Sequence, residues 1–407
     1  MEWNDRHVLI TGVSGFVGSH LARHLTDQGA RVFGLVRRRA DGSIPRNIRE
    51  KHIDRAIGII EGGLEDLPAL SSALDISAPD VIFHLGAQSY VPRSFTHPLE
   101  TAQTNGIGTN NLLEAIRIKD LSPVTVFAGS SEEYGLVFSS EEQYARMKEK
   151  YGVIFPEAEI PEVPIRETNP LRPMSPYAVS KVFGDYLMRN YYHTYGLKNI
   201  VSRAFNHEGA GRGIMFVTSV ITRQVAALRA GETDSMSIGN VNAFRDWSHV
   251  DDIIRGYCLL SESGRYGDVY NQGSMTTTSV LSYLLLSLEA AGMPVTRIES
   301  FRHEKVVEHP TETDKSPVFG VPFEKTRIDR MLLAEEVEYT LADGGVLVSS
   351  GDRQVRVEFD KERFRPAEVP ILFADTTKIR RLGFRTEHGT LDIIRDQLNY
   401  FIDAANR

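Results

Sequence analysis

Short apolar runs alternate with longer amphipathic stretches through the first half of the chain. The apolar runs predict strands at His7–Ile10, Arg31–Val36, Ala56–Ile60, Val81–His84, Thr125–Ala128 and Ile200–Ala204. The amphipathic stretches predict helices at Val17–Gln28, Leu67–Leu74, Thr101–Ile118 and Tyr177–Tyr195. Alternation of this kind predicts an α/β fold with a doubly wound parallel sheet, in which ligands bind beyond the carboxyl ends of the strands.

The second half of the chain is less regular. Its pattern predicts helices at Phe216–Ala230, Asp252–Ser261, Thr278–Ala291 and Leu391–Ala404. Polar and apolar residues alternate over Glu335–Val348 and Gln354–Phe359, around Gly344–Gly345 and Ser349–Gly351, which predicts one or two hairpins. No repeat or clear linker separates these segments, so those after about residue 203 are expected to fold back over the sheet as a smaller, discontinuous domain.

Composition narrows the class of protein. The chain has 407 residues, 41% of them hydrophobic, and a net charge of −8, which argues against a dedicated nucleic-acid binder. Cys258 is the only cysteine, so no disulfide forms within the chain and a reducing compartment is expected. No signal peptide and no apolar run near the roughly 20 residues needed to span a membrane are recognised. These features predict a soluble, cytoplasmic protein that does not bind a membrane.

A glycine-rich turn, TGVSGFVG (Thr11–Gly18), joins the first strand to the first helix. Glycines in this place let the backbone approach a pyrophosphate, which amides at the helix N-terminus then bind. The spacing is G-x-x-G-x-x-G, and an ordinary turn is the alternative for such a sequence taken alone. Its position predicts a Rossmann-type dinucleotide site, with cofactor contacts from Gly12, Gly15, Phe16, Val17 and Gly18.

Three arginines follow the second strand, in GLVRRRADG (Gly34–Gly42). An NAD site usually offers an acid here for the ribose 2′-hydroxyl, whereas arginine accommodates a 2′-phosphate. Because no acid precedes Asp41, Arg37 and Arg38 favour NADP, with NAD as the alternative. A solvated basic loop, or one that pairs with a neighbouring subunit, is the other interpretation.

The candidate chemistry lies in GSSEEYG (Gly129–Gly135) and SPYAVSK (Ser175–Lys181). Tyr177 and Lys181 are four residues apart and share one face of a helix. An ammonium beside a phenol favours the phenolate, so the pKa of Tyr177 is expected to lie below its free value of about 10. Ser130 adds a hydroxyl for the same substrate oxygen. Glu132 adds a second acid/base, which simple alcohol oxidation does not require.

These motifs are accompanied by HLGAQSYV, FNHEGAGRGIMFVT, GNVNAFRDWSHVDD and RPAEVPILFADTTKIRRLGF, in that order along the chain. The set resembles the extended short-chain dehydrogenases/reductases that act on nucleotide sugars, and within that family it is most similar to the GDP-mannose 4,6-dehydratases. The resemblance covers most of the chain. It implies NADP or NAD as cofactor, a nucleotide-diphosphate sugar as substrate, and a homodimer or homotetramer.

The resemblance also implies residue roles. Tyr177 would be the base at the sugar 4-hydroxyl, Lys181 would hold the nicotinamide ribose, Ser130 would stand at the family's active-site Ser/Thr position, and Glu132 matches the dehydratase glutamate. Leu85 would contact the cofactor. The residues assigned in this way to the substrate are Ser89, Asn206, Val217, Arg245, Arg365 and Glu368. For Ser89, a plain role at the end of a strand is an alternative.

The implied domains are 1–203 with 240–273 for the cofactor, and 204–239 with 274–407 for the nucleotide sugar. Two insertions, around Ser139–Pro161 and Phe319–Arg363, make the chain longer than typical relatives and are interpreted as lids, subunit contacts or surface elaborations. The chain also departs from the family in Gly63, where an Asp is common, and in Gly211 and Ser219, where the mannose branch tends to have Arg.

The mechanistic hypothesis is an internal redox elimination. Hydride moves from sugar C4 to C6 by way of the nicotinamide, Tyr177 removes the 4-hydroxyl proton, and Glu132 removes the C5 proton and assists loss of water from C6. A 4-epimerase and a 4-keto-sugar reductase are the alternatives within the enzymes, and a catalytically silent NADP(H) sensor is the alternative outside them.

Four further features have plain structural interpretations. Glu133 is expected to be a solvent-facing or hydrogen-bonding side chain, Tyr134 a packing residue and His249 a structural hydrogen-bonding residue. The group His303, Glu304, Glu308 and His309 is not interpreted as a metal site, and none is predicted.

Overall fold

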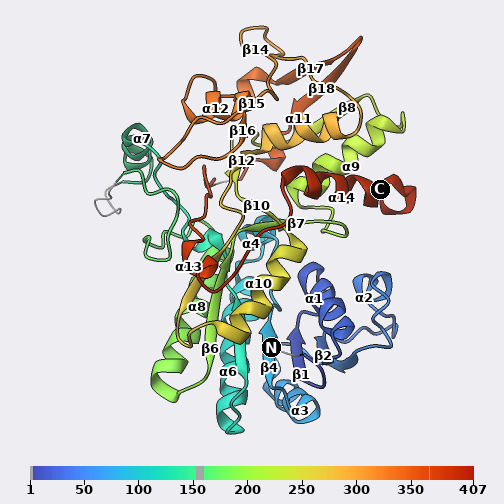
Figure 1. Cartoon of the computed structure of the whole chain (residues 1–407), viewed down its shortest axis with the longest axis vertical. Coiled ribbons are helices and arrows are strands. Elements are labelled where there is room, and N and C mark those ends of the chain that lie inside the picture. Colours follow the sequence, from blue (N-terminus) through green and yellow to red (C-terminus); the bar gives the residue numbers. More distant parts are fainter. Residues whose placement is uncertain (1–2, 153–159, 366) are drawn as a thin grey trace.

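The computed structural model describes residues 3–152, 160–365 and 367–407. Two principal sheets organise these residues (Figure 1). A seven-stranded parallel sheet lies in the lower half of Figure 1, and a five-stranded mixed sheet lies in the upper half. The predicted α/β class is therefore confirmed.

The parallel sheet contains all six predicted strands, with boundaries shifted by at most two residues, and one strand that was not predicted. In chain order its strands are β1 (His7–Thr11), β2 (Arg31–Val36), β3 (Gly58–Glu61), β4 (Val81–His84), β5 (Val124–Ala128), β6 (Asn199–Ala204) and β11 (Val269–Gln272). Their spatial order is β11-β6-β5-β4-β1-β2-β3. The order reverses between β1 and β4, which is where open sheets of this kind bind ligands.

Helices cover both faces of this sheet because each has one apolar stripe that needs burial. Helices α1 (Phe16–Asp27) and α10 (Val250–Ser263) pack on one face, through buried residues such as Leu21 and Ile253. The opposite face is covered by α3 (Leu67–Ser77), α6 (Gly108–Ile118) and α8 (Pro176–Tyr195). The connecting segments contain α2 (Arg46–Glu50), α4 (Val91–Thr96), α5 (Pro98–Thr101), the π-helix η1 (Ala102–Ile107), the 3₁₀ turn η2 (Ser131–Glu133) and α7 (Glu141–Tyr151).

The mixed sheet has the order β14-β13-β17-β18-β8. Its strands are β8 (Ser235–Ile238), β13 (Arg297–Ser300), β14 (Val306–Glu308), β17 (Gly345–Ser350) and β18 (Arg353–Phe359). Helices α9 (Val217–Arg229), α11 (Val280–Ala290) and α14 (Thr390–Ile402) share a second apolar core with it. Three of the four helices predicted in this half thus belong to this core, and the fourth is α10 beside the parallel sheet.

One hairpin, β17–β18, confirms the prediction of one or two hairpins, and residues 335–344 form no strand. The Asp343 carboxylate accepts a hydrogen bond from the Thr340 amide at 2.7 Å and caps a 3₁₀ turn, η3 (Leu341–Asp343). Gly344 then takes φ = 72°, a left-handed conformation that ends the turn. Local capping therefore overrides the polar–apolar alternation.

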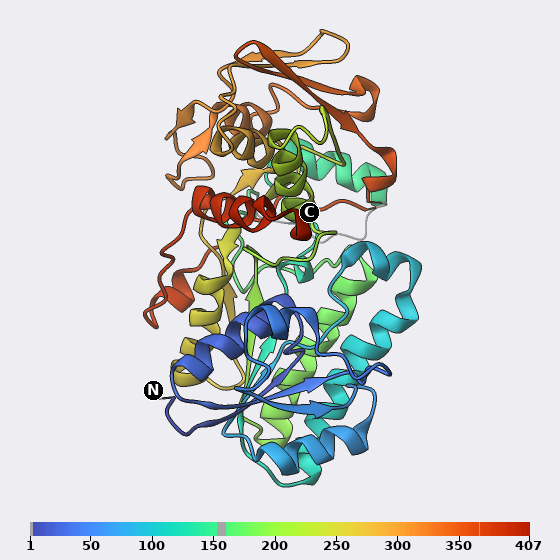
Figure 2. The same cartoon turned by 90° about the vertical axis from the view of Figure 1, so that its right-hand side faces the viewer.

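Small elements link the two sheets (Figure 2). Strand β7 (Asn206–Glu208) pairs with β10 (Trp247–His249), and β9 (Phe244–Arg245) pairs with β12 (Thr278–Ser279). The remaining elements are β15 (Thr313–Asp314), β16 (Lys325–Thr326), α12 (Arg327–Leu333), η4 (Lys361–Arg363), α13 (Thr377–Arg380) and η5 (Ala404–Asn406). Among the described residues, no helix is long and apolar enough to cross a bilayer.

The two predicted insertions have different structures. Residues 319–363 include α12 and the central strands β17 and β18 of the mixed sheet, so this insertion is part of the second core rather than a surface elaboration. The other contains α7, whose first turn is capped by Ser140, while its residues 153–159 lie outside the described part. The proposed domain boundaries stay a prediction.

Candidate active site

The glycine turn after β1 has the shape of a phosphate cradle. Gly12 takes φ = 74°, and a Cβ there would lie 2.7 Å from the Cα of Gly86. Gly15 begins α1 without a side-chain cap, and a Cβ on it would meet only the Gly12 carbonyl oxygen within 4 Å. The first amides of α1, at Phe16, Val17 and Gly18, are therefore free of a side-chain acceptor, which fits the pyrophosphate of a dinucleotide.

Three further predicted cofactor residues follow strands at this edge of the sheet. Leu85 follows β4 and donates its amide to the Thr11 carbonyl at 3.3 Å, beside the glycine turn. Arg37 and Arg38 follow β2 and are exposed. The Arg38 side chain is 83% exposed and lies 3.9 Å from Glu61, so its guanidinium is open to another anion.

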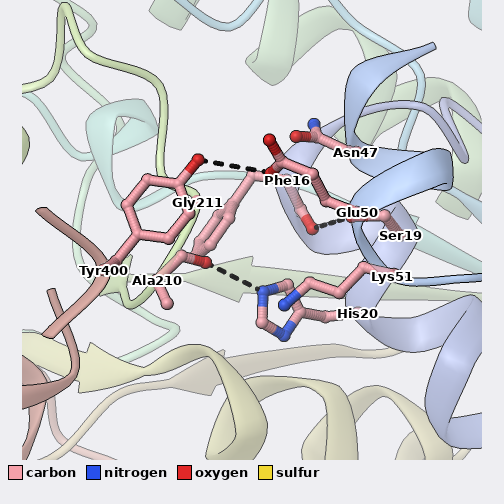
Figure 3. Close-up of a pocket in the computed structure, with 9 residues that line it drawn as sticks. All are labelled: Phe16, Ser19, His20, Asn47, Glu50, Lys51, Ala210, Gly211 and Tyr400. Carbon is pink, nitrogen blue, oxygen red and sulfur yellow. Dashed lines mark hydrogen bonds between the residues drawn. The ribbon is translucent and has the colours of Figure 1, made fainter. Parts of the chain in front are cut away.

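A cavity of about 170 Å³ is lined by residues of α1, α2, α14 and the loop after β7 (Figure 3). In Figure 3, His20 and Lys51 lie side by side, with Tyr400 on the opposite side of the view. The His20 ring is 3.2 Å from the Ala210 carbonyl oxygen, and the Tyr400 hydroxyl donates to Glu50 at 3.2 Å. The Phe16 side chain lines this cavity, and its ring lies 5.0 Å from that of His20 and 5.3 Å from the Arg212 guanidinium.

Tyr177 and Lys181 lie on the first turns of α8. Ser175 caps this helix by accepting a hydrogen bond from the Ala178 amide at 3.1 Å, and Pro176 occupies the first helical position. The two side chains are buried, with 8% and 3% exposed. The Lys181 ammonium donates to the Ala128 carbonyl at 2.6 Å and lies 6.0 Å from the centre of the Tyr177 ring.

The expected lowering of the Tyr177 pKa is wrong for the chain itself. Burial raises the pKa of Tyr177 to about 12; a hydrogen bond with Ser130 lowers it, and the Glu132 charge raises it further. Burial also lowers the pKa of Lys181 to about 8, while the Glu133 carboxylate raises it. Desolvation is therefore the largest influence on the proton affinity of the phenol.

The turn after β5 holds Ser130 and two glutamates in different surroundings. The Ser130 hydroxyl accepts from the Glu132 amide at 3.2 Å, and the Glu133 carboxylate accepts from the Ser130 amide at 2.7 Å. Glu133 is fully buried and lies 3.2 Å from Nε of Arg203, which also pairs with Asp185 at 2.9 Å. The interpretation of Glu133 as a hydrogen-bonding residue is confirmed, and the solvent-facing one is wrong.

Glu132 points instead toward the segment after β18. Its carboxylate oxygen accepts from Nη1 of Arg365 at 3.3 Å. The same Arg365 nitrogen is 4.0 Å from Glu368, which accepts a 2.9 Å hydrogen bond from Arg245. The structure thus brings together four predicted residues from distant parts of the sequence: Glu132, Arg245, Arg365 and Glu368.

The other predicted substrate residues have weaker support. Asn206 begins β7, and its side-chain oxygen is buried without a hydrogen-bond partner among the described residues. An unpartnered buried acceptor of this kind fits a ligand donor. Val217 begins α9 and is partly buried, and Ser89 is exposed in the loop after β4.

Residues 8–273 match the model of the NAD dependent epimerase/dehydratase family. The chain belongs to the NAD-dependent epimerase/dehydratase family. It is 32% identical to a GDP-mannose 4,6-dehydratase of Vibrio cholerae over 99% of this chain and 95% of that protein. It is also 32% identical to a GDP-mannose 4,6-dehydratase of Sinorhizobium fredii (strain HH103), over 97% of this chain and 98% of the relative.

Solved structures confirm the fold of this epimerase/dehydratase. RMD from Pseudomonas aeruginosa complexed with NADPH matches with a TM-score of 0.64 at 21% identity, over 98% of this chain and 99% of that chain. UDP-glucose 4-epimerase from Thermotoga maritima with UDP-glucose matches with a TM-score of 0.67 at 21% identity and the same coverage. An NAD(P) cofactor is expected for the family.

Asn105 is a residue of this family member that the sequence analysis missed. It lies on the π-helix η1, is 2% exposed, and accepts a hydrogen bond from the Gln88 amide at 2.8 Å. Its amide nitrogen donates to the Gln88 carbonyl at 3.0 Å and to the Ser180 hydroxyl at 2.9 Å. It therefore ties the loop after β4 to α8, between Tyr177 and Lys181. A polar residue inside a predicted helix gave no local signal of this role.

The structure of this epimerase/dehydratase confirms two interpretations from the sequence: Tyr134 is a packing residue, and His249 is a structural hydrogen-bonding residue. The Tyr134 hydroxyl donates to Asn271 at 2.7 Å within a packed core, and the His249 ring is 3.3 Å from the Asp396 carboxylate. In the described parts of the chain, no group of three or more His, Cys, Asp or Glu side chains is arranged to hold a metal ion.

Proposed function

We propose that this chain is a nucleotide-sugar 4,6-dehydratase that uses NADP and converts a GDP-mannose-like substrate into its 4-keto-6-deoxy product. The observation that carries the proposal is the position of Glu132. The turn that presents Ser130 to Tyr177 also holds this carboxylate close enough for its charge to raise the pKa of the phenol. Alcohol oxidation uses the Ser–Tyr–Lys set, and elimination requires the additional acid/base.

Tyr177, Ser130 and Lys181 are proposed to act at the sugar 4-hydroxyl. Ser130 hydrogen-bonds the Tyr177 phenol and so orients it toward that oxygen. Tyr177 must be a phenolate to accept the hydroxyl proton, and the positive charges of Lys181 and of a bound oxidised nicotinamide would favour that form over the protonated phenol of the cofactor-free chain. A bound nicotinamide would supply the hydride acceptor and donor, and the Gly12–Gly18 turn and Lys181 are the groups that would hold it.

Glu132 is proposed to work at the neighbouring carbons. Oxidation at C4 makes the C5 proton acidic, and a carboxylate beside C5 removes it. The same group, now protonated, delivers its proton to the departing C6 hydroxyl. Each proton transfer by a positioned acid/base accelerates a reaction by roughly 10²–10⁴-fold.

The substrate assignment has two supports. Arg365 pairs with Glu132, and Arg245 pairs with the neighbouring Glu368; guanidinium groups bind phosphate oxygens by charge-assisted hydrogen bonds. The curated relatives from Vibrio cholerae and Sinorhizobium fredii are named GDP-mannose 4,6-dehydratases. Arg37 and Arg38 support NADP over NAD through their exposed charges after β2.

The alternatives share the fold. The similar solved structures include a UDP-glucose 4-epimerase and a dTDP-glucose 4,6-dehydratase from Streptomyces venezuelae, so the fold does not separate epimerase, reductase and dehydratase. Glu132 favours the dehydratase because epimerisation at C4 needs no acid/base at C5. The intact pair of Tyr177 and Lys181 argues against a silent cofactor sensor.

Incubation with GDP-mannose, and in parallel UDP- and dTDP-hexoses, in D₂O tests the proposal by mass spectrometry and NMR. We expect loss of water with deuterium at C5 and no net consumption of added NADPH. Inversion at C4 without water loss selects the epimerase. Stoichiometric oxidation of NADPH by a 4-keto sugar selects the reductase.

A second copy of this chain is the proposed partner. Val179, Phe183 and Tyr186 lie on one face of α8 and are 54%, 45% and 56% exposed, next to the 41% exposed Ile107. We expect Phe183→Asp to reduce the mass measured by light scattering to that of one chain. Ile402→Asp, at a 66% exposed position on α14, is the matched control and should leave the mass unchanged. A wild-type protein that is already a single chain would contradict the proposal.

A further inference from the structure

Four charged side chains form an alternating row beside the proposed reaction centre. The row runs from Glu132 to Arg365 (3.3 Å), to Glu368 (4.0 Å) and to Arg245 (2.9 Å). Two arginines are thereby balanced by two carboxylates. A diphosphate that binds these arginines must therefore compete with carboxylates of the chain itself.

The two arginines differ in how firmly they are held. Arg245 is 5% exposed and donates to the carbonyls of Phe244 and Val369, both at 2.8 Å, as well as to Glu368. The Arg365 side chain is 27% exposed and makes one 3.3 Å hydrogen bond and one 4.0 Å ion pair, both to carboxylates. Arg365 is thus free to change partner, and Arg245 is anchored.

We propose that Arg365 is a substrate-operated latch on Glu132. In the substrate-free protein Arg365 pairs with Glu132 and neutralises it. A nucleotide-sugar diphosphate draws Arg365 away, and the Glu132 carboxylate becomes available to the sugar only then. This inference rests on the proposed function for its substrate class, but it concerns binding and does not depend on the reaction performed.

The energies allow such an exchange. A single 3.3 Å ion pair with partly exposed side chains, such as Arg365–Glu132, holds its arginine weakly. A guanidinium bound to phosphate makes charge-assisted, often bidentate hydrogen bonds that are roughly twice as strong as neutral ones. The diphosphate therefore wins Arg365, and the lost pair with Glu132 weakens its apparent affinity by roughly 1.5- to 5-fold.

A double-mutant binding cycle tests the latch. GDP, and in parallel UDP and dTDP, is titrated calorimetrically into the NADP⁺-saturated wild type, Glu132→Gln, Arg365→Gln and the double variant. We expect Glu132→Gln to tighten binding by roughly 2- to 5-fold, because Arg365 no longer has to leave a partner. In the Arg365→Gln background the same substitution should change affinity by less than about 1.5-fold.

The cycle separates the latch from simple repulsion between Glu132 and the phosphates. Repulsion would make Glu132→Gln tighten binding equally with and without Arg365, and that result would overturn the latch. Arg365→Lys keeps a cation and should restore part of the coupling to Glu132. Arg363→Gln is the matched control, because Arg363 pairs with Asp360 at 3.1 Å; coupling to Glu132 should be absent there.

Failure of the proposed function gives a different result. If no nucleoside diphosphate binds the wild type, both proposals are wrong. If diphosphates bind and the cycle shows the coupling, but no nucleotide sugar loses water, the latch stands and the dehydratase proposal falls. Thermal melts of all variants confirm that each one is folded during the titrations.

Discussion

Glu132 and Glu133 are neighbours in one 3₁₀ turn, yet they belong to two unlike charge clusters. Glu133 joins Arg203 and Asp185, whose side chains are at most 3% exposed and whose ion-pair distances are 2.9 and 3.2 Å. Glu132 joins Arg365, at 11% and 27% exposure and 3.3 Å. Buried charged side chains whose hydrogen bonds are all made hold one conformation. Partly exposed charged side chains with few contacts can exchange one partner for another. One turn thus combines a rigid support with an adaptable reactive group.

We expect the largest effect on activity from substitution of Glu132, the more exposed of the two glutamates. We expect Glu132→Gln to lower the rate of dehydration by roughly 10²–10⁴-fold, because the C5 proton loses its base. Its free energy of unfolding should stay within about 1 kcal/mol of wild type, since the lost pair is partly exposed. Product formation, NADP⁺ titration and urea unfolding measure the three properties. Retained dehydration would remove Glu132 from the mechanism.

Substitution of the buried Glu133 should instead lower the stability of the fold. Glu133→Ala leaves the Ser130 amide without its buried acceptor and removes one of the two carboxylates that pair with Arg203, so we expect a loss of about 1–3 kcal/mol in the free energy of unfolding. Glu133→Gln, which keeps an acceptor for the Ser130 amide, should lose less. Urea denaturation measures both variants. A cost below that of Glu132→Ala would erase the contrast between the two clusters.

Lys181 belongs with Glu133 in this comparison, because its side chain is also buried and the Glu133 charge raises its pKa. Burial lowers its pKa to about 8, from an ordinary value of about 10.4, so the folded protein carries the cost of a desolvated charge below pH 8. We expect Lys181→Met to raise the free energy of unfolding at pH 7 by about 1–3 kcal/mol while activity is lost.

The pH dependence gives the sign of that cost. Between about pH 8 and 10.4 the unfolded chain holds more protons on this lysine than the folded chain, so wild-type stability rises with pH. The advantage of Lys181→Met should therefore shrink across this range. Unfolding measured at pH 7, 9 and 10 tests this, and a constant difference would contradict the lowered pKa.

Arg38 adds a third case to the comparison, a charged side chain that is largely exposed to solvent. Its side chain is 83% exposed, so Arg38→Ala should leave the melting temperature unchanged. We expect NADP⁺ affinity to fall by about 10-fold, with little change for NAD⁺, because one charge-assisted contact to a 2′-phosphate is lost. Fluorescence titration with both nucleotides measures the ratio. An equal loss for both cofactors would argue against a role in 2′-phosphate recognition.

The sequence was most informative where structure is set by local pattern. The strands from β1 to β6 follow from apolar runs, and Tyr177 and Lys181 share a helix face because four residues make about one turn. The pKa of Tyr177 could not be predicted from this pattern: it is raised rather than lowered, because it depends on how deeply the fold buries the phenol. Of the one or two hairpins predicted, one forms, and the alternation before Gly344 gives no strand because an aspartate cap holds a 3₁₀ turn there.

Contacts between distant segments lay beyond local prediction. The resemblance assigned Arg365 to the substrate, but its hydrogen bond to Glu132 joins residues 233 positions apart and has no sequence signal. The same holds for Asn105 and Ser180, which are 75 positions apart. The burial of Glu133 could not be predicted from the local sequence either, because Arg203 and Asp185, which surround it, lie on a strand and a helix far along the chain.

The π-helix at Ala102–Ile107 has a consequence for how this protein tolerates change. Each such turn accommodates one residue more than a regular helical turn would, so every side chain after it is rotated around the axis. Deleting a single residue there would give a more regular helix, yet Asn105 would no longer face Gln88 and Ser180. The irregularity is thus a length requirement: the chain can exchange residues in this stretch far more easily than it can lose one.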